Sequence, residues 1–175
     1  MKRVCAWCRK DLGSVESENH SADTVSHGIC SDCSSMLRPQ FGMSIDRYID
    51  TLPVPVLATE VYNGRIIVKA ANEPACKAVG KELREVVQHL AGNVFECDHA
   101  RLPEGCGRTM HCSGCAIRRS VMTTFETGEP QGMVPATLSR FAPDAPTVVA
   151  MTITTVKIGD LVVLRVDRMG PEGPA

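Results

Sequence analysis

The nine cysteines of this 175-residue chain constrain its fold more than any other feature. They form one group of four near the N-terminus and a second group of four near the middle, with Cys76 left over. An odd number argues against a complete disulfide framework, and the four-plus-four partition indicates two sites with four thiolate ligands each. The predicted ligands are Cys5, Cys8, Cys30 and Cys33 in the first site, and Cys97, Cys106, Cys112 and Cys115 in the second.

The first group consists of two Cys-x2-Cys pairs, a spacing typical of closed tetrahedral metal sites. Residues 1–38, the N-terminal segment, contain too little apolar material to fold alone, and a structural metal is the usual remedy. We therefore predict a structural Zn²⁺ with no open position for catalysis. Unliganded thiols and a disulfide switch are the alternatives. We expect His20 and His27 to be surface residues rather than substitute ligands, and Trp7 to pack on the first pair.

The second group has the spacing Cys-x8-Cys-x5-Cys-x2-Cys, with only one tight pair. We call residues 97–115 the cysteine-rich loop, because Pro103, Gly105 and Gly107 make regular structure improbable there. Zn²⁺ is the first expectation for this site, and a [4Fe–4S] cluster, which also takes four cysteines, is the second. A thiol–disulfide switch is a third.

Other polar groups lie near these cysteines. Arg118 and Arg119 follow in the first turn of a helix, where one of them would offset negative charge, although a solvated helix face is the simpler interpretation. We expect His99 and His111 to be exposed. Cys76 is expected to be a buried, inert thiol.

Residues 39–52 are interpreted as a connector that contains a short helix. Apolar residues recur at helical spacing over 44–52, Ser44 is a suitable N-cap, and Pro53 ends the helix. Strands are expected at 56–61 and 65–70, joined at Asn63-Gly64, a strong hairpin signal. Further helices are expected from Asn72 to Gly80, from Leu83 to near Gly92, and over 114–127.

Three strands are expected near 131–140, 147–156 and 161–168, and Pro135 places the first of them at an edge or a bulge. Residues 170–175 are expected to be a disordered tail. Grouped strands with helices inserted between them predict an α+β domain around an antiparallel sheet.

Residues 53–169 resemble a PAS domain. The resemblance rests on the entry Pro55-Val56-Leu57, the Asn63-Gly64 hairpin, and the run from Ala71 through Asn72 to Gly80. It implies a five-stranded antiparallel sheet with helices on one face, and a role in sensing small molecules or in protein interaction.

Two further resemblances involve the cysteines. Residues 5–8 and 26–33 are similar to a four-cysteine segment appended to bacterial sensor kinases and response regulators. Residues 93–119 look like the corresponding stretch of a cysteine-bearing subgroup of bacterial PAS proteins. The loop before the last long helix of a PAS domain borders the internal cavity, so the resemblance implies a functional position for the second site.

Together these features predict a sensor or adaptor module that acts through a partner chain, and no enzyme, because no catalytic motif is present. The expected partners are a histidine kinase or regulator, a second copy bound through the connector helix, or both. The net charge of −1 and pI of about 6.5 exclude the broad positive field that nucleic acid needs. With no apolar run long enough for a membrane span and no signal sequence, we expect a cytoplasmic protein.

Overall fold

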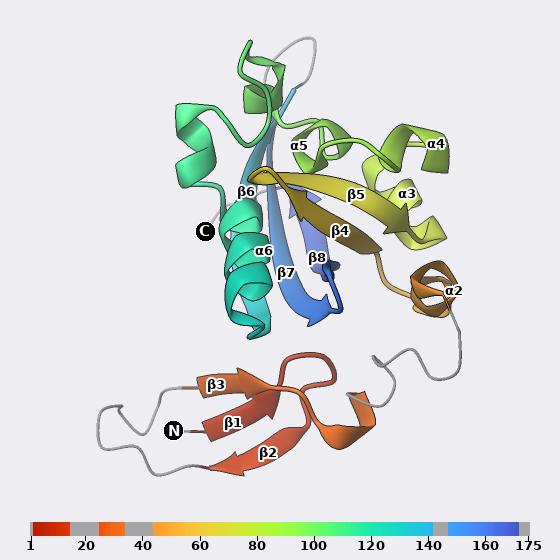
Figure 1. The fold of residues 1–175 in the computed structure, drawn as a ribbon, viewed down its shortest axis with the longest axis vertical. Coiled ribbons are helices and arrows are strands. Elements are labelled where there is room, and N and C mark those ends of the chain that lie inside the picture. Colours follow the sequence, from red (N-terminus) through yellow and green to blue (C-terminus); the bar gives the residue numbers. More distant parts are fainter. Residues whose placement is uncertain (1, 15–24, 34–43, 142–146, 172–175) are drawn as a thin grey trace.

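The structure is a computed structural model that describes residues 2–14, 25–33, 44–141 and 147–171. Figure 1 shows two sheets, a small one built from the N-terminal segment and a larger one that carries the remaining helices. His20, parts of the N-terminal segment and connector, and residues 172–175 of the expected tail lie outside the described residues.

The larger sheet has five antiparallel strands in the order β5-β4-β8-β7-β6. Its strands confirm the five predicted from the sequence, with β8 continuing to Pro171, two residues into the expected tail. β6 is an edge strand, where Pro135 can be accommodated, and its register shifts between Gln131 and Val134. The bounds are β4 Val56–Tyr62, β5 Arg65–Ala71, β6 Gln131–Arg140, β7 Thr147–Ile158 and β8 Leu161–Pro171.

Local sequence signals explain how the first half of this domain is built. Asn63 and Gly64 both have positive φ in the β4–β5 turn, as the hairpin signal predicts. Asn72 caps α3 (Glu73–Val79) by accepting from the amide of Ala75, and Gly80 ends that helix in the left-handed conformation. The connector helix is α2 (Ile45–Asp50), with Ser44 as its N-cap.

The helix predicted from Leu83 to near Gly92 is wrong in extent. α4 ends at Val86, and α5 covers Ala91–Val94. Between them, Gln88 has a positive φ, and its amide donates to the carbonyl of Val68 over 2.7 Å. The exposed edge of β5 therefore takes hydrogen bonds that a continuous helix would have used internally.

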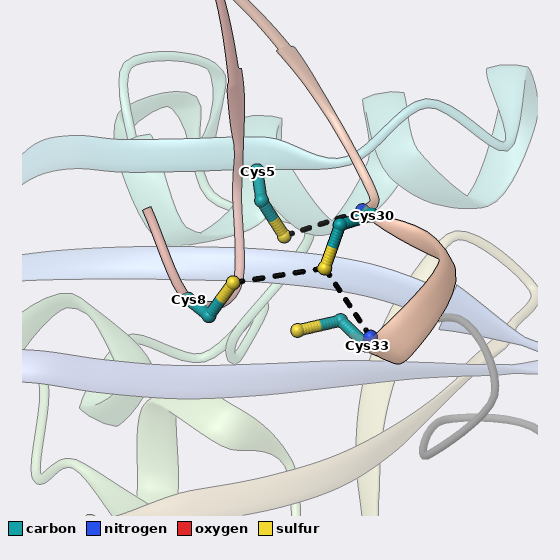
Figure 2. Close-up of side chains that lie close together, drawn as sticks. All are labelled: Cys5, Cys8, Cys30 and Cys33. Atoms are coloured by element: carbon teal, nitrogen blue, oxygen red, sulfur yellow. Dashed lines mark hydrogen bonds between the residues drawn. The ribbon is translucent and has the colours of Figure 1, made fainter. Parts of the chain in front are cut away.

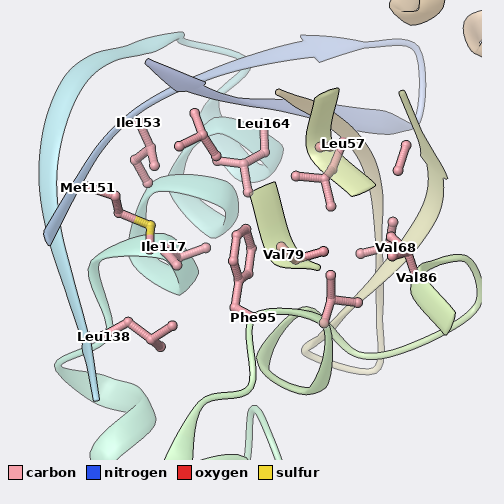
Figure 3. Packing of buried hydrophobic residues seen from close by; sticks show 14 of the residues in the cluster. Leu57, Val68, Val79, Val86, Phe95, Ile117, Leu138, Met151, Ile153 and Leu164 are labelled. Carbon is pink, nitrogen blue, oxygen red and sulfur yellow. The ribbon is translucent and has the colours of Figure 1, made fainter. Parts of the chain in front are cut away.

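The helices between β5 and β6 pack on one face of the larger sheet, and the main core lies between these helices and the sheet (Figure 3). Leu57 of β4, Leu164 of β8 and Phe95, which follows α5, are all at most 3% exposed. α6 (Ala116–Thr127) contributes Ile117 to this core. The predicted α+β fold with helices on one face is therefore confirmed.

The opposite face of the larger sheet is covered by the N-terminal segment and α2. Side chains alternate along a strand, so Val56 and Ala58 of β4 and Val163 of β8 point away from the helices. They pack with Trp7 and Ile49 in a second core. The small sheet has the order β2-β1-β3, with β1 Lys2–Cys5, β2 Asp11–Ser14 and β3 Val25–Gly28. The N-terminal segment thus forms the outer layer of the PAS-like sheet.

Candidate metal centres

The first four cysteines converge on one point (Figure 2). β1 ends at Cys5 and β3 ends just before Cys30, and the parallel pairing of these strands brings the two Cys-x2-Cys turns together. All four sulfur atoms lie within 4.8 Å of one another, and the Sγ atoms of Cys8 and Cys30 are 3.7 Å apart. This cluster has the donor set and spacing to hold a metal ion.

Backbone amides support negative charge on these sulfurs. The amide of Cys30 donates to Sγ of Cys5 over 3.4 Å, and the amide of Cys33 donates to Sγ of Cys30 over 3.3 Å. Burial raises the pKa of Cys5, but hydrogen bonds from the amides of Cys8, Cys30 and Trp7 more than offset it and lower the pKa to about 6. Burial and the neighbouring thiols raise the pKa of Cys33. A bound cation would favour the thiolate at every position.

The first site is attached to the larger sheet by Arg165, which the sequence analysis did not identify. Its guanidinium donates to the carbonyl of Trp7 over 2.6 Å and to that of Ala6 over 3.4 Å. It also pairs with Asp167 at 2.7 Å and lies 4.4 Å from the indole centroid of Trp7. A charged residue inside the apolar run of β8 was the available signal.

His27 packs on the sheet rather than substituting for a cysteine. A Cβ added at Gly132 of β6 would lie 2.7 Å from the His27 ring, so the ring occupies the space above that glycine. Burial lowers the pKa of His27, and the charge of Arg9 lowers it further. The neutral imidazole is therefore the form that this contact favours.

The second four cysteines line a single cavity of about 280 Å³ on the helix side of the larger sheet. Cys97 follows α5, Cys106 lies within the cysteine-rich loop, and Cys112 and Cys115 precede α6. His99 and His111 also line the cavity, with ring centroids 3.9 Å apart in an edge-on arrangement. His99 is only partly exposed, whereas His111 is exposed as expected.

These sulfurs are spaced differently from those of the first site. Within the part of the chain that the structure describes, no three ligand atoms from the second group and its two histidines all lie within 4.8 Å of one another. The structure therefore places the second set around a cavity instead of at a point. Its role as a metal site stays a prediction.

Cys112 is the member of the second set best prepared to carry negative charge. Burial raises its pKa, but a hydrogen bond from the Thr109 hydroxyl, the amide of Gly107 at 3.1 Å and the charge of Arg118 together lower it below the ordinary value. Burial raises the pKa of Cys97 and of Cys106.

Two arginines attach the β4–β5 turn to its neighbours, Arg118 from α6 and Arg65 toward the cysteine-rich loop. Arg118 donates to the carbonyl of Gly64 over 3.0 Å, and Arg65 donates to the carbonyl of Glu104 over 3.2 Å. Arg118 thus has a role beyond a solvated helix face, whereas Arg119 is exposed. Cys76 is partly buried against the main core, and burial raises its pKa.

Gly92 of α5 permits the position of Cys106. A Cβ at Gly92 would lie 2.6 Å from Sγ and 2.9 Å from Cβ of Cys106, which is closer than real side chains approach. The sequence indicated this glycine only as a helix end. A glycine is needed at position 92 because of Cys106, which is 14 positions away in the chain.

Among known proteins, only solved structures are similar to this chain. No protein-family model matches the chain, and no curated protein matches it. Solved structures similar to this chain include a LOV protein from Rhodobacter sphaeroides, with 13% identity, 71% of this chain and 64% of that chain covered, and a TM-score of 0.47. The matched region thus spans slightly less than two thirds of that protein.

Two further neighbours are single domains. One is the photoactive yellow protein domain of the sensor histidine kinase Ppr from Rhodospirillum centenum, with 15% identity, 73% and 95% coverage of the two chains, and a TM-score of 0.42. The other is the PAS domain of a Desulfitobacterium hafniense protein, with 13% identity, 70% and 95% coverage, and a TM-score of 0.36. The PAS-like assignment rests on the strand order and helix placement described above. Among the described helices, none is long and apolar enough to cross a membrane.

Proposed function

We propose that this chain is a signal-sensing module in which a [4Fe–4S] cluster, held by Cys97, Cys106, Cys112 and Cys115, occupies the cavity of the PAS-like domain. The observation that supports this function is the convergence of all four cysteines of the second set on one cavity of that domain. The signal is the presence or absence of the cluster. The first site holds a structural Zn²⁺.

Zinc at the first site is supported by its dimensions. Tetrahedral Zn²⁺ with Zn–S bonds of about 2.3 Å places its sulfurs roughly 3.8 Å apart. The separation of 3.7 Å between the Sγ atoms of Cys8 and Cys30 matches that value. Four protein ligands leave no position for substrate, so the proposed role of this ion is structural.

A cluster at the second site is supported by the contrast between the two sets of cysteines. A cube of four irons and four sulfides is several ångströms across, so its cysteine sulfurs stand further apart than those around a single ion. The second set has such a wider arrangement around a cavity, whereas the first set does not. A single Zn²⁺ at the second site would require the cysteine-rich loop to contract.

The chain's own residues fit an anionic group in this cavity. The amide of Gly107 and the hydroxyl of Thr109 already contact Sγ of Cys112, and Arg118 supplies positive charge. Hydrogen bonds and charge near cluster sulfurs stabilise the bound state. Such a cluster supplies one-electron redox chemistry when it is bound.

The cavity residues also provide a route by which occupancy changes the surface. Arg118 touches both the cavity and the carbonyl of Gly64, and Arg65 joins the β4–β5 turn to the cysteine-rich loop. Loss of the cluster removes the group that holds the four thiolates together. The loop and the β4–β5 turn would then move together, presenting a different surface to a partner.

We propose that the output passes to a second protein, such as a histidine kinase or regulator, or to a second copy through the connector helix. The proposed setting is the reducing cytoplasm, where the eight cysteines of the two sites remain reduced and available for metal. Catalysis is not part of the proposal, because both cysteine sets supply four ligands.

Hydrogen exchange tests this function directly. Protein reconstituted anaerobically with iron and sulfide is compared with cluster-free protein that retains zinc. We expect faster exchange in the cysteine-rich loop and the β4–β5 turn after cluster loss, and no such change in Cys112→Ser, which cannot hold the cluster. Cys76→Ser, which removes the remaining thiol, should respond like the wild type. Identical exchange in loaded and cluster-free wild type would overturn the sensing role.

A further inference from the structure

Glu96 closes the C-terminal end of α5 in the left-handed conformation, with a φ of 58°, at a position where glycine is usual. The amide of Cys97 donates to the carbonyl of Gly92 over 2.7 Å, and the amide of Glu96 donates to that of Asn93 over 3.3 Å. These two hydrogen bonds form a Schellman motif. Glycine would satisfy this motif with less backbone strain, so the glutamate side chain calls for a separate reason.

The carboxylate of Glu96 joins separate segments of the domain. Its Oε2 atom lies 3.1 Å from both Nε and Nη2 of Arg140, the last residue of β6. Its Oε1 atom lies 3.5 Å from Nζ of Lys81, which also donates to the carbonyl of Asn93 over 2.6 Å. Arg140 donates in turn to the carbonyl of Val79, the last residue of α3, over 3.2 Å. The Glu96 side chain therefore connects the end of α5 with β6 and with the end of α3.

The backbone around Glu96 is attached to the end of β6 as well. The carbonyl of Glu96 accepts from the amide of Phe141 over 3.0 Å, and Cys97 forms an isolated antiparallel bridge with Arg140. Cys97 is also partly buried against the main core and lines the cavity of the second set. These contacts hold the backbone of Cys97 against β6 before any group enters the cavity.

We propose that Glu96 is a positioning residue for the second site, which through its ion pair with Arg140 fixes Cys97 at the cavity. A left-handed conformation at a non-glycine residue persists only where the surrounding structure holds it, and here the ion pair does so. This inference rests on the proposed function of the second site. It adds that Cys97 keeps its place on β6 when the cluster is lost, whereas Cys106 belongs to the loop that moves.

The exposure of the ion pair separates positioning from global stability. The side chains of Glu96 and Arg140 are 36% and 30% exposed, and partly exposed ion pairs contribute little to the free energy of unfolding. Replacing Glu96 by glycine also removes the left-handed strain. The two effects oppose each other in global stability, whereas the loss of the ion pair acts directly on the position of Cys97.

Glu96→Gly tests the inference, because it keeps the helix end and removes the link to Arg140. Arg140→Gln removes the same link from the other side, and Gln88→Gly, at an exposed left-handed position with a φ of 65°, is the matched control. Cluster-free protein that retains zinc is treated with iodoacetamide, and peptide mass spectrometry follows the modification of Cys97. We expect Cys97 to react several times faster in both link variants than in the wild type or in Gln88→Gly.

Iron release to a chelator is then measured for protein reconstituted anaerobically with iron and sulfide. We expect about tenfold faster release from both link variants than from the wild type. Wild-type rates of Cys97 modification or of iron release in both variants would overturn the positioning role. An equal rise in modification at Cys76 in Glu96→Gly would also overturn it, because Cys76 lies outside the cavity and its exposure indicates general loosening. If the wild type takes up no iron, the proposed function fails, and the Cys97 modification rates still decide whether Glu96 fixes that cysteine.

Discussion

Arg165 and Trp7 are 158 positions apart in the chain, and the guanidinium of the first donates to the carbonyl of the second over 2.6 Å. The same guanidinium lies 4.4 Å from the indole centroid and pairs with Asp167, whose side chain is only 11% exposed. A buried charge is tolerated when its hydrogen bonds are satisfied. The charge of Arg165 is satisfied by backbone carbonyls of the turn between Cys5 and Cys8. These hydrogen bonds join the N-terminal segment to the PAS-like sheet.

Arg165→Met should therefore destabilise the whole chain. It removes the donors to Trp7 and leaves the Asp167 carboxylate buried without its cation, a change that costs about 3 kcal/mol or more. Denaturant unfolding of zinc-loaded protein measures the loss. Arg168→Met, which changes an exposed arginine on the same strand, is the control and should remain within about 0.5 kcal/mol of the wild type. Equal effects from the two variants would contradict a special role for Arg165.

Gly92→Ala should impair the second site while leaving the first intact. The added Cβ would lie 2.6 Å from Sγ of Cys106, so that cysteine must leave its place in the cavity. We expect reduced iron incorporation and unchanged zinc content by elemental analysis. Gly114→Ala is the matched control in the same cavity lining, because its Cβ meets only a carbonyl at 3.7 Å. Normal iron content in Gly92→Ala would show that Cys106 is dispensable.

Asn72→Asp should be strongly destabilising although the two side chains have the same shape. The Oδ1 atom accepts from the amides of Val56 and Ala75, which a carboxylate can also do. The Nδ2 atom donates to three carbonyls, the shortest contact being 2.8 Å to Val54, and a carboxylate would be repelled by all three.

We expect a loss of about 3 kcal/mol or more for Asn72→Asp, since a buried charge would face unpaired carbonyls. Thermal unfolding provides the measurement. Asn63→Asp, at an exposed turn position where aspartate is also favourable, should change the midpoint little. A neutral effect at Asn72 would disprove its role in joining α2, β4 and α3.

The contact of His27 with Gly132 predicts a pH dependence. The pKa of His27 in the folded chain lies below its ordinary value of 6.5, so the unfolded chain binds the proton first as the pH falls. The stabilising contribution of the neutral ring is present above about pH 6.5 and is lost as the pH falls through that value.

His27→Gln cannot titrate, so its stability should decline less than that of the wild type between pH 7.5 and 5.5. These two pH values bracket the ordinary histidine pKa, about 6.5. Metal release in acid affects both proteins, and the difference between them isolates the histidine. Parallel pH profiles for the two proteins would rule out this contribution.

The sequence predicted the elements better than their contacts. The five strands, the Asn63-Gly64 hairpin and the caps of α3 follow from local chemistry that operates within a few residues. The helix expected after Leu83 was wrong because the exposed edge of β5 competes for the hydrogen bonds of residues 88–89, a tertiary effect that periodicity does not contain.

In the candidate sites, too, local spacing predicted some features and missed those that depend on distant segments. Paired Cys-x2-Cys turns predict convergence, and the first four cysteines converge. The spacing of the second four fixes neither the distances between sulfurs nor the nature of the occupant. Gly92 and Arg165 escaped prediction as site residues because each contacts a partner from a distant segment, which neither periodicity nor spacing contains.

Metal analysis of anaerobically purified protein, with the visible absorption spectrum, tests the central claim most directly. The wild type should contain one zinc and four irons per chain and show the broad visible absorption of an iron–sulfur cluster. Cys112→Ser/Cys115→Ser should lose the iron and the colour but keep the zinc, and Cys5→Ser/Cys8→Ser should lose the zinc. Two zinc ions and no iron in colourless wild-type protein would contradict the account.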